Sequence, residues 1–298
     1  MAKYAITGAS GLIGSALAKA LEERGDSVLR IGRGSNKNTD IEWDPSRAIL
    51  DASDLDGLDG LVHLAGESIE GRWSKRKKDR ILDSRILGTS LLAAKISELD
   101  NPPKVVVSSS AIGFYGNRGD EILSEKSVSG SGFLAEVCKK WELEATAIES
   151  PKTRLVIART GIVCTPMGGA LPKILQTLKF FVGGPLGSGK QWWSWISLED
   201  EIRALLHLLD SDVDGAVNLV APEPVTNKSF VKIFGKQMSR PSFLVAPSLA
   251  LRLLLGEMAD GLLLASARVK PDALTESGFV FKHSNLDSAA RELTDSHE

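Results

Sequence analysis

The glycines near the start of the chain form a pattern that suits phosphate binding. Residues 7–14 read Thr-Gly-Ala-Ser-Gly-Leu-Ile-Gly and follow a short apolar run. Gly8 would permit a tight turn off a strand, Gly11 would let backbone amides approach a pyrophosphate, and Gly14 would let a helix pack closely on the strand. The pyrophosphate would then lie at the positive end of that helix. The residues predicted to contact it are Gly8, Ser10, Gly11, Leu12, Ile13 and Gly14.

The end of the second predicted strand, residues 27–31, distinguishes the two nicotinamide cofactors. An NAD site usually carries Asp or Glu there, because a carboxylate accepts hydrogen bonds from the ribose hydroxyls. This chain has Arg33 between two glycines, and no acidic residue lies closer than Asp40. A guanidinium suits a 2′-phosphate, since it forms bidentate, charge-assisted hydrogen bonds. The sequence therefore favours NADP(H) over NAD(H); the alternative is that Arg33 is a solvated residue in a polar loop that runs to Asn38.

Small and hydroxyl-bearing residues follow the later apolar runs, which we predict to be short, buried parallel strands. In an open α/β sheet the ligand binds beyond the carboxyl ends of the strands. Small residues there leave room for an adenosine, and hydroxyls can contact the cofactor or hold a carbonyl or alcohol. After residues 61–64 come Ala65 and Gly66; after residues 104–107 come Ser108 and Ser109, predicted beside the cofactor, and Ser110, predicted to hold the substrate oxygen.

These residues need a sheet to position them, and strand-like runs alternate with helix-like runs over the first two-thirds of the chain. Helices are predicted near residues 75–98 and 133–149. The alternation predicts an α/β fold with a Rossmann-like, doubly wound parallel sheet and a smaller C-terminal lobe on the substrate side. The predicted larger domain comprises residues 1–165 and about 197–222, and the smaller lobe about 166–196 and 223–298.

Further motifs are Ser84-Arg85 with Gly88-Thr89, Trp141-Glu142, Gly183 to Gly189, Gln191, and Gly256-Glu257. With the glycine turn, the serine cluster, Tyr115-Gly116 and Arg159, they make the chain resemble the extended short-chain dehydrogenases/reductases. More narrowly, it resembles the NAD(P)-dependent epimerase subgroup with a C-terminal domain of unknown function. The resemblance spans nearly the whole chain. It implies a Rossmann-like fold, NADP(H) binding, and the following residues near the cofactor: Leu64, Ala65, Gly66, Arg85 and Val163.

One departure concerns the acid–base pair of that family. Typical members carry a Tyr, and a Lys four residues later, on the helix after the serine strand. Here the two possible registers place Phe133 and Val137, or Leu134 and Cys138, at these positions. Tyr115 could supply the missing acid, or it could be a packing residue whose hydroxyl is satisfied.

Each of three other motifs can be interpreted in two ways from the sequence. Arg85 stands where typical members keep an Asn, and this fixed cation could clamp a cofactor phosphate or an acidic substrate. The segment 184–190 fits the start of a P-loop, but Gln191 replaces the Ser or Thr that would hold magnesium. A glycine loop passing close to a ligand is the interpretation we favour. Trp192 would face away from Trp193 and its neighbour Trp195, so that one face could stack on a planar ligand, or all three could be packed.

Composition excludes several classes of protein. The formal net charge of −2 argues against a nucleic-acid binder, and the basic run 72–80 is expected to be solvated. His63 has no partner at metal-ligand spacing, so we expect no metal site. No apolar run reaches membrane-spanning length, and the N-terminus lacks a signal-peptide pattern. With only two cysteines, Cys138 and Cys164, the expected setting is reducing and cytoplasmic.

Three functional hypotheses follow. The leading one is an NADP(H)-dependent oxidoreductase or epimerase with an unusual proton donor, acting on a small carbonyl or sugar-like substrate. In it, Ser110 holds the substrate oxygen and Tyr115 or water is the acid. The second is a non-catalytic NADP(H)-responsive sensor or scaffold, which the missing Tyr and Lys favour. The third is a nucleoside triphosphatase, which Gln191 and the absence of a following helical pattern oppose.

Overall fold

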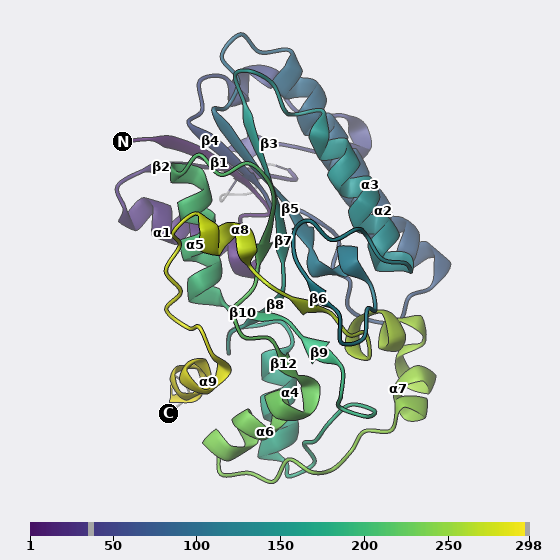
Figure 1. The fold of residues 1–298 in the computed structure, drawn as a ribbon. Helices are drawn as coiled ribbons and strands as arrows, with labels where there is room; N and C mark the ends of the chain where they lie inside the picture. The colour runs from purple at the N-terminus through teal and green to yellow at the C-terminus, as the bar shows by residue number, and fades with distance from the viewer. Residues whose placement is uncertain (35–38, 296–298) are drawn as a thin grey trace.

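A seven-stranded parallel sheet forms the centre of the computed structural model, which describes residues 1–34 and 39–295. The chain winds outward from β1 in both directions, so the strand order reverses between β1 and β4 (Figure 1). That reversal creates the crevice in which ligands of open α/β sheets bind. Across the sheet the strands are β11 (Gly215–Leu219), β7 (Arg154–Thr160), β5 (Val105–Ala111), β4 (Gly60–His63), β1 (Lys3–Thr7), β2 (Ser27–Gly32) and β3 (Ile41–Glu42).

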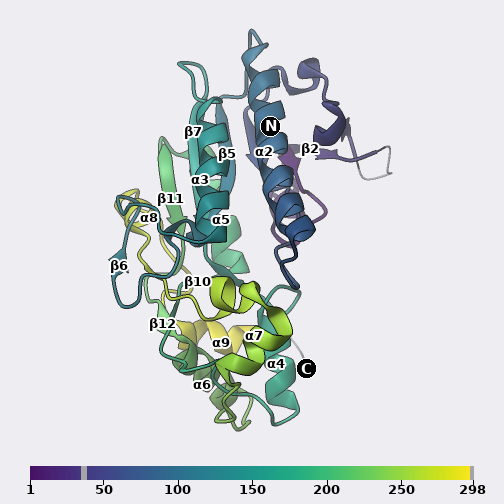
Figure 2. The same ribbon diagram turned by 90° about the vertical axis from the view of Figure 1, so that its right-hand side faces the viewer.

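Helices cover both faces of the sheet, which confirms the predicted α/β, doubly wound class. One face carries α1 and α5, which contact each other, and the other carries α2 and α3, which lie side by side in Figure 2. Two separate hydrophobic cores lie above and below the strands. The helices span Leu12–Glu23 (α1), Lys75–Ser97 (α2), Phe133–Thr146 (α3) and Leu198–Asp210 (α5).

The local sequence explains where these elements begin and end. Val105, Val106 and Val107 of β5 are all buried, because a central parallel strand is covered on both faces. Helix α1 begins directly after Gly11, and Gly25 with φ of 89° follows its end, as the sequence predicts. Helix α2 begins after Ser74, whose side chain accepts a hydrogen bond from the Lys77 amide.

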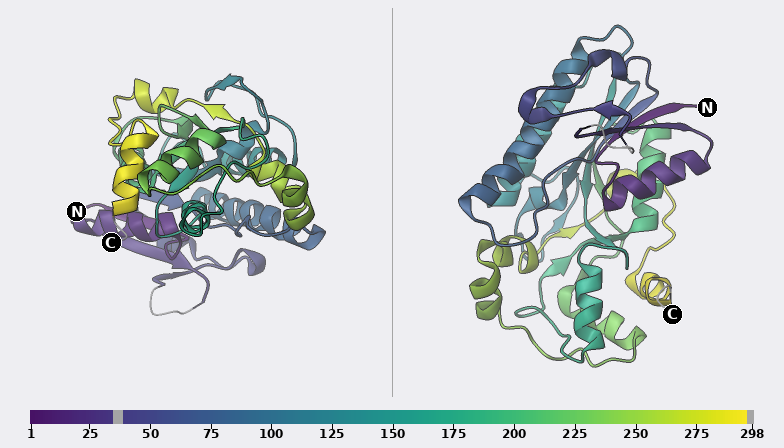
Figure 3. Two further views of the ribbon diagram at one scale, coloured as in Figure 1. Left: turned by 90° about the horizontal axis from the view of Figure 1, so that it is seen from below. Right: turned by 180° about the vertical axis from the view of Figure 1, so that it is seen from behind.

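A smaller lobe lies beyond the carboxyl ends of the strands (Figures 1 and 3). Its core packs Trp193, Trp195, Phe230 and Phe234 together. Three two-stranded sheets complete the fold: β8 with β10, β9 with β12, and β6 with β13. The elements are β6 (Ile122–Leu123), β8 (Ile162–Cys164), α4 (Leu171–Lys179), β9 (Trp192–Trp193), β10 (Trp195–Ser197), β12 (Val225–Thr226), α6 (Asn227–Gln237), α7 (Ser248–Leu255), β13 (Arg268–Val269) and α9 (Leu286–Asp295).

The C-terminal segment does not stay within this lobe. Helix α8 (Asp272–Glu276) packs against β11, and its Leu274 is buried in the core of the larger part. The predicted limits at residues 165, 197 and 222 remain a prediction, but α5 and β11 return to the sheet as expected. Within residues 1–34 and 39–295, no helix is both long and apolar enough to span a membrane.

Candidate functional site

The glycine turn has the shape that a bound pyrophosphate requires. Gly8 has φ of 69°, and a Cβ there would lie 2.9 Å from the Ala65 amide nitrogen. A Cβ on Gly14 would lie 2.3 Å from the Gly8 carbonyl oxygen, so only glycine fits where α1 crosses the turn. Gly11 is the cap of α1 and no side chain caps the helix. The first-turn amides are therefore suited to bind phosphate oxygens, and the residues present fit a dinucleotide.

A buried histidine fixes this turn to the neighbouring strand. His63 Nδ1 lies 2.7 Å from Thr7 Oγ1, and its Nε2 lies 3.1 Å from Thr89 Oγ1 on α2. Thr7 Oγ1 also accepts hydrogen bonds from the Leu64 and Ala65 amides, both at 3.1 Å. Burial, assisted by the nearby Arg85 cation, lowers the pKa of His63 to about 4, so the ring is neutral. His63 thus has a positioning role.

No part of the described structure brings together three or more His, Cys, Asp or Glu side chains that could share a metal ion.

The role of Arg33 in recognising a 2′-phosphate stays a prediction. Arg33 directly follows β2, and its side chain is exposed. Asp40, the nearest acidic residue, accepts a hydrogen bond from the Arg30 amide at 2.7 Å. That carboxylate therefore supports the strand rather than the ribose position of an NAD site. The rest of the predicted polar loop, residues 35–38, lies outside the described residues.

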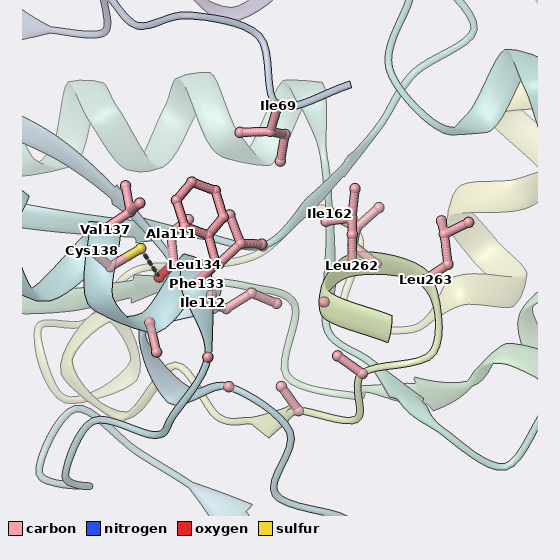
Figure 4. Close-up of a pocket in the computed structure, with 18 of the residues that line it drawn as sticks. Ile69, Ala111, Ile112, Phe133, Leu134, Val137, Cys138, Ile162, Leu262 and Leu263 are labelled. Atoms are coloured by element: carbon pink, nitrogen blue, oxygen red, sulfur yellow. Dashed lines mark hydrogen bonds between the residues drawn. The ribbon is translucent and has the colours of Figure 1, made fainter. Parts of the chain in front are cut away.

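A cavity of about 600 Å³ lies between the sheet and the smaller lobe (Figure 4). Its walls come from the end of β5, the first turns of α3, the segment after β7, and the segment that follows α7. Most of the lining is apolar, and Figure 4 shows Ile112, Phe133, Ile162 and Leu262 around the space. Three residues predicted to contact the cofactor line it, namely Leu12, Arg85 and Val163.

The α3 wall shows the loss of the usual acid–base pair. Phe133, Leu134, Val137 and Cys138, the four positions considered for Tyr and Lys, all line the cavity. Burial and the neighbouring Glu142 raise the pKa of the Cys138 thiol to about 11, so this group is neutral. No proton donor of the usual kind is presented from this wall.

Ser110 and Tyr115 lie behind the cavity wall rather than on it. Ser110 Oγ donates to Glu142 Oε1 at 2.6 Å, and Tyr115 Oη donates to Asn218 Oδ1 at 2.7 Å. Arg159 joins the two, because it pairs with Glu142 at 2.8 Å and donates to Tyr115 Oη at 3.0 Å. Both hydroxyls are thus committed to a buried network, and neither residue is part of the cavity lining. This geometry does not support their predicted catalytic roles, and for Tyr115 it favours the packing alternative.

The other two serines of the cluster also lie outside the cavity lining. Ser108 is buried, and its Oγ has no hydrogen-bond partner among the described residues, whereas Ser109 is partly exposed. The predicted contact of both residues with the cofactor stays a prediction.

A polar pair that the sequence analysis missed reaches the cavity from β7. Thr160 lines the cavity, and its Oγ1 donates to Glu201 Oε1 at 2.8 Å. Glu201 is 1% exposed, and its second carboxyl oxygen has no partner in the described part of the chain. Burial raises the pKa of Glu201 to about 8, so the carboxyl is protonated at neutral pH. Its sequence signal is its place on the buried stripe of α5, between Leu198 and Leu205.

Arg85 is the cation of the cavity. Its Nη1 donates to the carbonyl oxygens of Glu67 and Ile81 at 3.1 and 3.0 Å, and its guanidinium lies 5.0 Å from the centre of the Trp141 ring. A Cβ on Gly66 would lie 3.2 Å from the guanidinium carbon, so Gly66 makes room for it. Burial lowers the pKa of this guanidinium, which reflects the cost of desolvating the charge.

The tryptophans separate as their alternation predicts. Trp193 and Trp195 are buried in the lobe core, whereas Trp192 faces Arg268, whose guanidinium lies 4.2 Å from the ring centre. Trp192 and Trp193 line the cavity, so the stacking alternative stays open for them. After Gln191 the chain continues as β9 and not as a helix, which is not the context of a P-loop.

Comparisons with known proteins agree with this geometry. Residues 4–220 match the NAD dependent epimerase/dehydratase family, and residues 246–293 match a domain of unknown function (DUF1731). An epimerase family protein of Mycobacterium tuberculosis is 41% identical over 97% of this chain and 96% of its own. The chloroplastic SDR39U1 homologue of Arabidopsis thaliana, also an epimerase family protein, is 36% identical, and the match covers 97% of this chain and 85% of the length of that protein.

Among solved structures, the crystal structure of human epimerase family protein SDR39U1 (isoform 2) with NADPH superposes with a TM-score of 0.91. It is 30% identical and covers 98% of this chain and 99% of its own. The nicotinamide cofactor in that structure is the one that the sequence favours here. Because the family match covers most of the chain and the relatives align with it nearly end to end, the chain belongs to the NAD dependent epimerase/dehydratase family.

Proposed function

We propose that this protein binds NADP(H) and transfers a hydride between the cofactor and a carbonyl or alcohol carbon of a substrate held in the cavity. The Gly8–Gly14 turn, the uncapped start of α1 and Arg33 support the choice of cofactor, as does NADPH in the human relative. The observation that carries the proposed chemistry is the Thr160–Glu201 pair, which supplies a proton donor at the cavity in place of the missing Tyr and Lys.

The proton balance assigns a role to each member of the pair. In the reducing direction bound NADPH would supply a hydride to the carbonyl carbon, and the carbonyl oxygen would then need a proton. Thr160 turns its hydroxyl proton away from Glu201 Oε1 and donates it to that oxygen. The Glu201 carboxyl, protonated at Oε1, then restores the proton across the same 2.8 Å contact, in which donor and acceptor have exchanged. Glu201 is left as a carboxylate and takes up a proton before the next turnover. The oxidising direction runs these steps in reverse.

The direct test uses NADPH that carries deuterium stereospecifically at C4, incubated with a broad panel of carbonyl compounds and followed by mass spectrometry. The proposal expects deuterium in the product for at least one substrate. If the substrate is oxidised and reduced again within one turnover, the product instead has inverted configuration without net cofactor consumption. NADPH that binds tightly and never loses its label, with no inversion across the panel, would refute hydride transfer.

The proton route has a separate test. Thr160→Val removes the hydroxyl and should lower kcat by about 10²-fold or more, while the Kd for NADPH stays unchanged. Thr177→Val, which changes an exposed threonine on α4, is the matched control and should leave both quantities unchanged. An unaltered kcat in Thr160→Val would remove this residue from the mechanism and leave the cofactor proposal standing.

A second candidate function is a non-catalytic NADP(H)-responsive sensor or scaffold. It is favoured by the apolar side chains of Phe133 and Val137 at the cavity, where a catalytic pair would be polar. It expects a partner whose binding changes with the NADPH/NADP⁺ ratio. Affinity capture at the two extremes of that ratio tests it, and a set of captured proteins that does not change with the ratio would count against it.

A further inference from the structure

The charges around the cavity are balanced with one exception. Three acidic residues line it, and each is held by a cation: Glu70 by Lys173 at 2.8 Å, Asp260 by Arg252 at 2.9 Å, and Glu257 by Lys78. In each pair at least one side chain is about half exposed, so these pairs lie at the rim of the cavity. Within the described residues, no carboxylate lies within ion-pair distance of the remaining charged lining residue, Arg85.

The carboxylates near Arg85 are paired with other cations, and the charge of Glu67 acts on Arg85 only as a minor influence that raises its pKa against the effect of burial. Glu67, whose carbonyl accepts from Arg85, directs its carboxylate to Lys77 at 2.8 Å and Arg80 at 3.2 Å. Glu142 is bound in the ion pair with Arg159. Cys138 shares the cavity wall but is a neutral thiol, as its raised pKa requires. A desolvated cation in such surroundings is costly unless a ligand brings a negative charge.

One edge of the Arg85 guanidinium makes no hydrogen bond to the described residues. A guanidinium has five N–H donors, and the two hydrogen bonds that Arg85 donates to Glu67 and Ile81 both come from Nη1. Among the described residues, Nε and Nη2 make none. These two nitrogens form the edge that binds a carboxylate through two parallel hydrogen bonds. The Trp141 ring and the two carbonyl oxygens hold the side chain in place, so little conformational entropy is lost when an anion binds.

Most of the remaining lining is apolar. Of its uncharged polar side chains, Asn117 and Ser194 are hydrogen-bonded to the backbone of residues 266–269, and Ser131 adds one further hydroxyl. Ile112, Phe133, Leu134, Ile162 and Leu262 offer apolar contacts and no hydrogen bonds from their side chains. A nucleotide or a sugar with many hydroxyls would need a wall of polar partners, because unpaired polar groups are costly to bury. A compound with one anionic group and an apolar body matches both features.

We propose that Arg85 binds the carboxylate of the substrate, and that the substrate is an apolar oxo or hydroxy acid. This proposal rests on the proposed function, because it takes the cavity as the substrate site. The carboxylate lies on the bidentate edge of Arg85, the apolar body contacts the α3 wall, and the reacting oxygen faces Thr160. The alternative that Arg85 instead contacts a phosphate of the cofactor is an outcome of the test.

The test measures binding and requires no turnover. The protein loaded with NADP⁺, which cannot reduce an oxo acid, is titrated calorimetrically with apolar 2-oxo acids, such as 4-methyl-2-oxopentanoate and phenylpyruvate, and with their uncharged methyl esters. We expect each acid that binds to bind more tightly than its ester by about 10- to 100-fold, the size of a charge-assisted pair. The preference should disappear in Arg85→Gln and persist in part in Arg85→Lys, while the Kd for NADPH stays unchanged.

Each other result counts against the proposal. Equal binding of acid and ester to the unmutated protein, or no binding of either, overturns it even if Arg85→Gln does not fold. A preference that survives in a folded Arg85→Gln protein assigns the carboxylate to another residue. A weaker Kd for NADPH in Arg85→Gln assigns Arg85 to the cofactor. If no deuterium is transferred from NADPH but the protein still binds the acids more tightly than their esters, hydride transfer is refuted and the anion site at Arg85 stands.

Discussion

Replacement of Glu201 by glutamine tests the buried acid at the centre of the proposed proton route. The pKa of this carboxyl rises from an ordinary 4.5 to about 8 on folding, because burial disfavours the carboxylate. The folded state therefore binds more protons than the unfolded state between these values. Since a raised folded pKa favours the protonated native form, stability falls as the pH rises through this window. Glutamine has a similar shape and cannot ionise.

The expected magnitude follows from the width of the window. From pH 5 to pH 8 the folded protein retains a proton that the unfolded chain has largely lost, which is about three pKa units. At about 1.4 kcal/mol per unit, the carboxyl costs roughly 4 kcal/mol of unfolding free energy over this range. The free energy of unfolding of Glu201→Gln, relative to that of the unmutated protein, should therefore rise by about this amount between pH 5 and pH 9. At pH 5 the two proteins should differ little.

Urea unfolding of both proteins at pH 5, 7 and 9 measures this difference. Glu199→Gln is the matched control, because Glu199 lies on the same turn of α5 and is paired with Lys282 near the surface. The control should show the same pH dependence as the unmutated protein. If Glu201→Gln did so as well, the carboxyl would not be a buried, protonated acid, and the proton route would lose its source.

Three further predictions concern the turn, the cofactor and the buried network. Arg33→Ala should reduce the preference for NADPH over NADH by about 10- to 100-fold, measured as the ratio of the two Kd values, because it removes a charge-assisted contact. Gly14→Ala should weaken NADPH binding at least tenfold, since its Cβ would lie 2.3 Å from the Gly8 carbonyl oxygen and must displace the turn. Glu142→Ala should lower the free energy of urea unfolding by about 3–5 kcal/mol, because it leaves Arg159 buried and unpaired.

Neighbouring substitutions serve as controls for these three. Arg30→Ala on β2 and Ser15→Ala on α1 should leave cofactor selectivity and affinity unchanged. Glu136→Ala breaks an exposed pair with Lys139 on α3 and should cost less than about 1 kcal/mol. Equal Kd values for NADPH and NADH in the unmutated protein would disprove the role of Arg33. Tight NADPH binding by Gly14→Ala, or a loss in Glu142→Ala no larger than in Glu136→Ala, would contradict the corresponding geometry.

The sequence predicted the sheet and the glycine turn because both depend on local patterns. A short apolar run followed by glycines at fixed spacing has few other structural solutions, and α1 starts after Gly11 as expected. Arg33 could be placed because it follows β2 directly. The absence of the Tyr–Lys pair was equally clear, since both possible registers on α3 gave apolar residues and all four of them line the cavity.

The hydroxyls that reach the cavity could not be predicted in the same way, because side-chain direction at a strand end depends on what packs behind it. Ser110 and Tyr115 follow the right strand, but Arg159 is a buried cation next to them and needs Glu142 and their oxygens as partners. Thr160, one residue after Arg159, faces the opposite way and reaches the cavity. Alternation along β7 therefore places Arg159 in the buried network and Thr160 at the cavity.

The same reasoning connects the three unusual features of the cavity. An apolar α3 wall removes the proton donor of the family from one side, and Thr160 with Glu201 provides hydroxyl and carboxyl groups from another. Because Glu201 carries no charge at neutral pH, it does not neutralise Arg85, which has no ion-pair partner among the described residues. An uncharged acid is also the form that donates a proton to a reduced carbonyl. A substrate anion would then bind without repulsion from the acid, and activity in the reducing direction should fall as the pH rises through about 8.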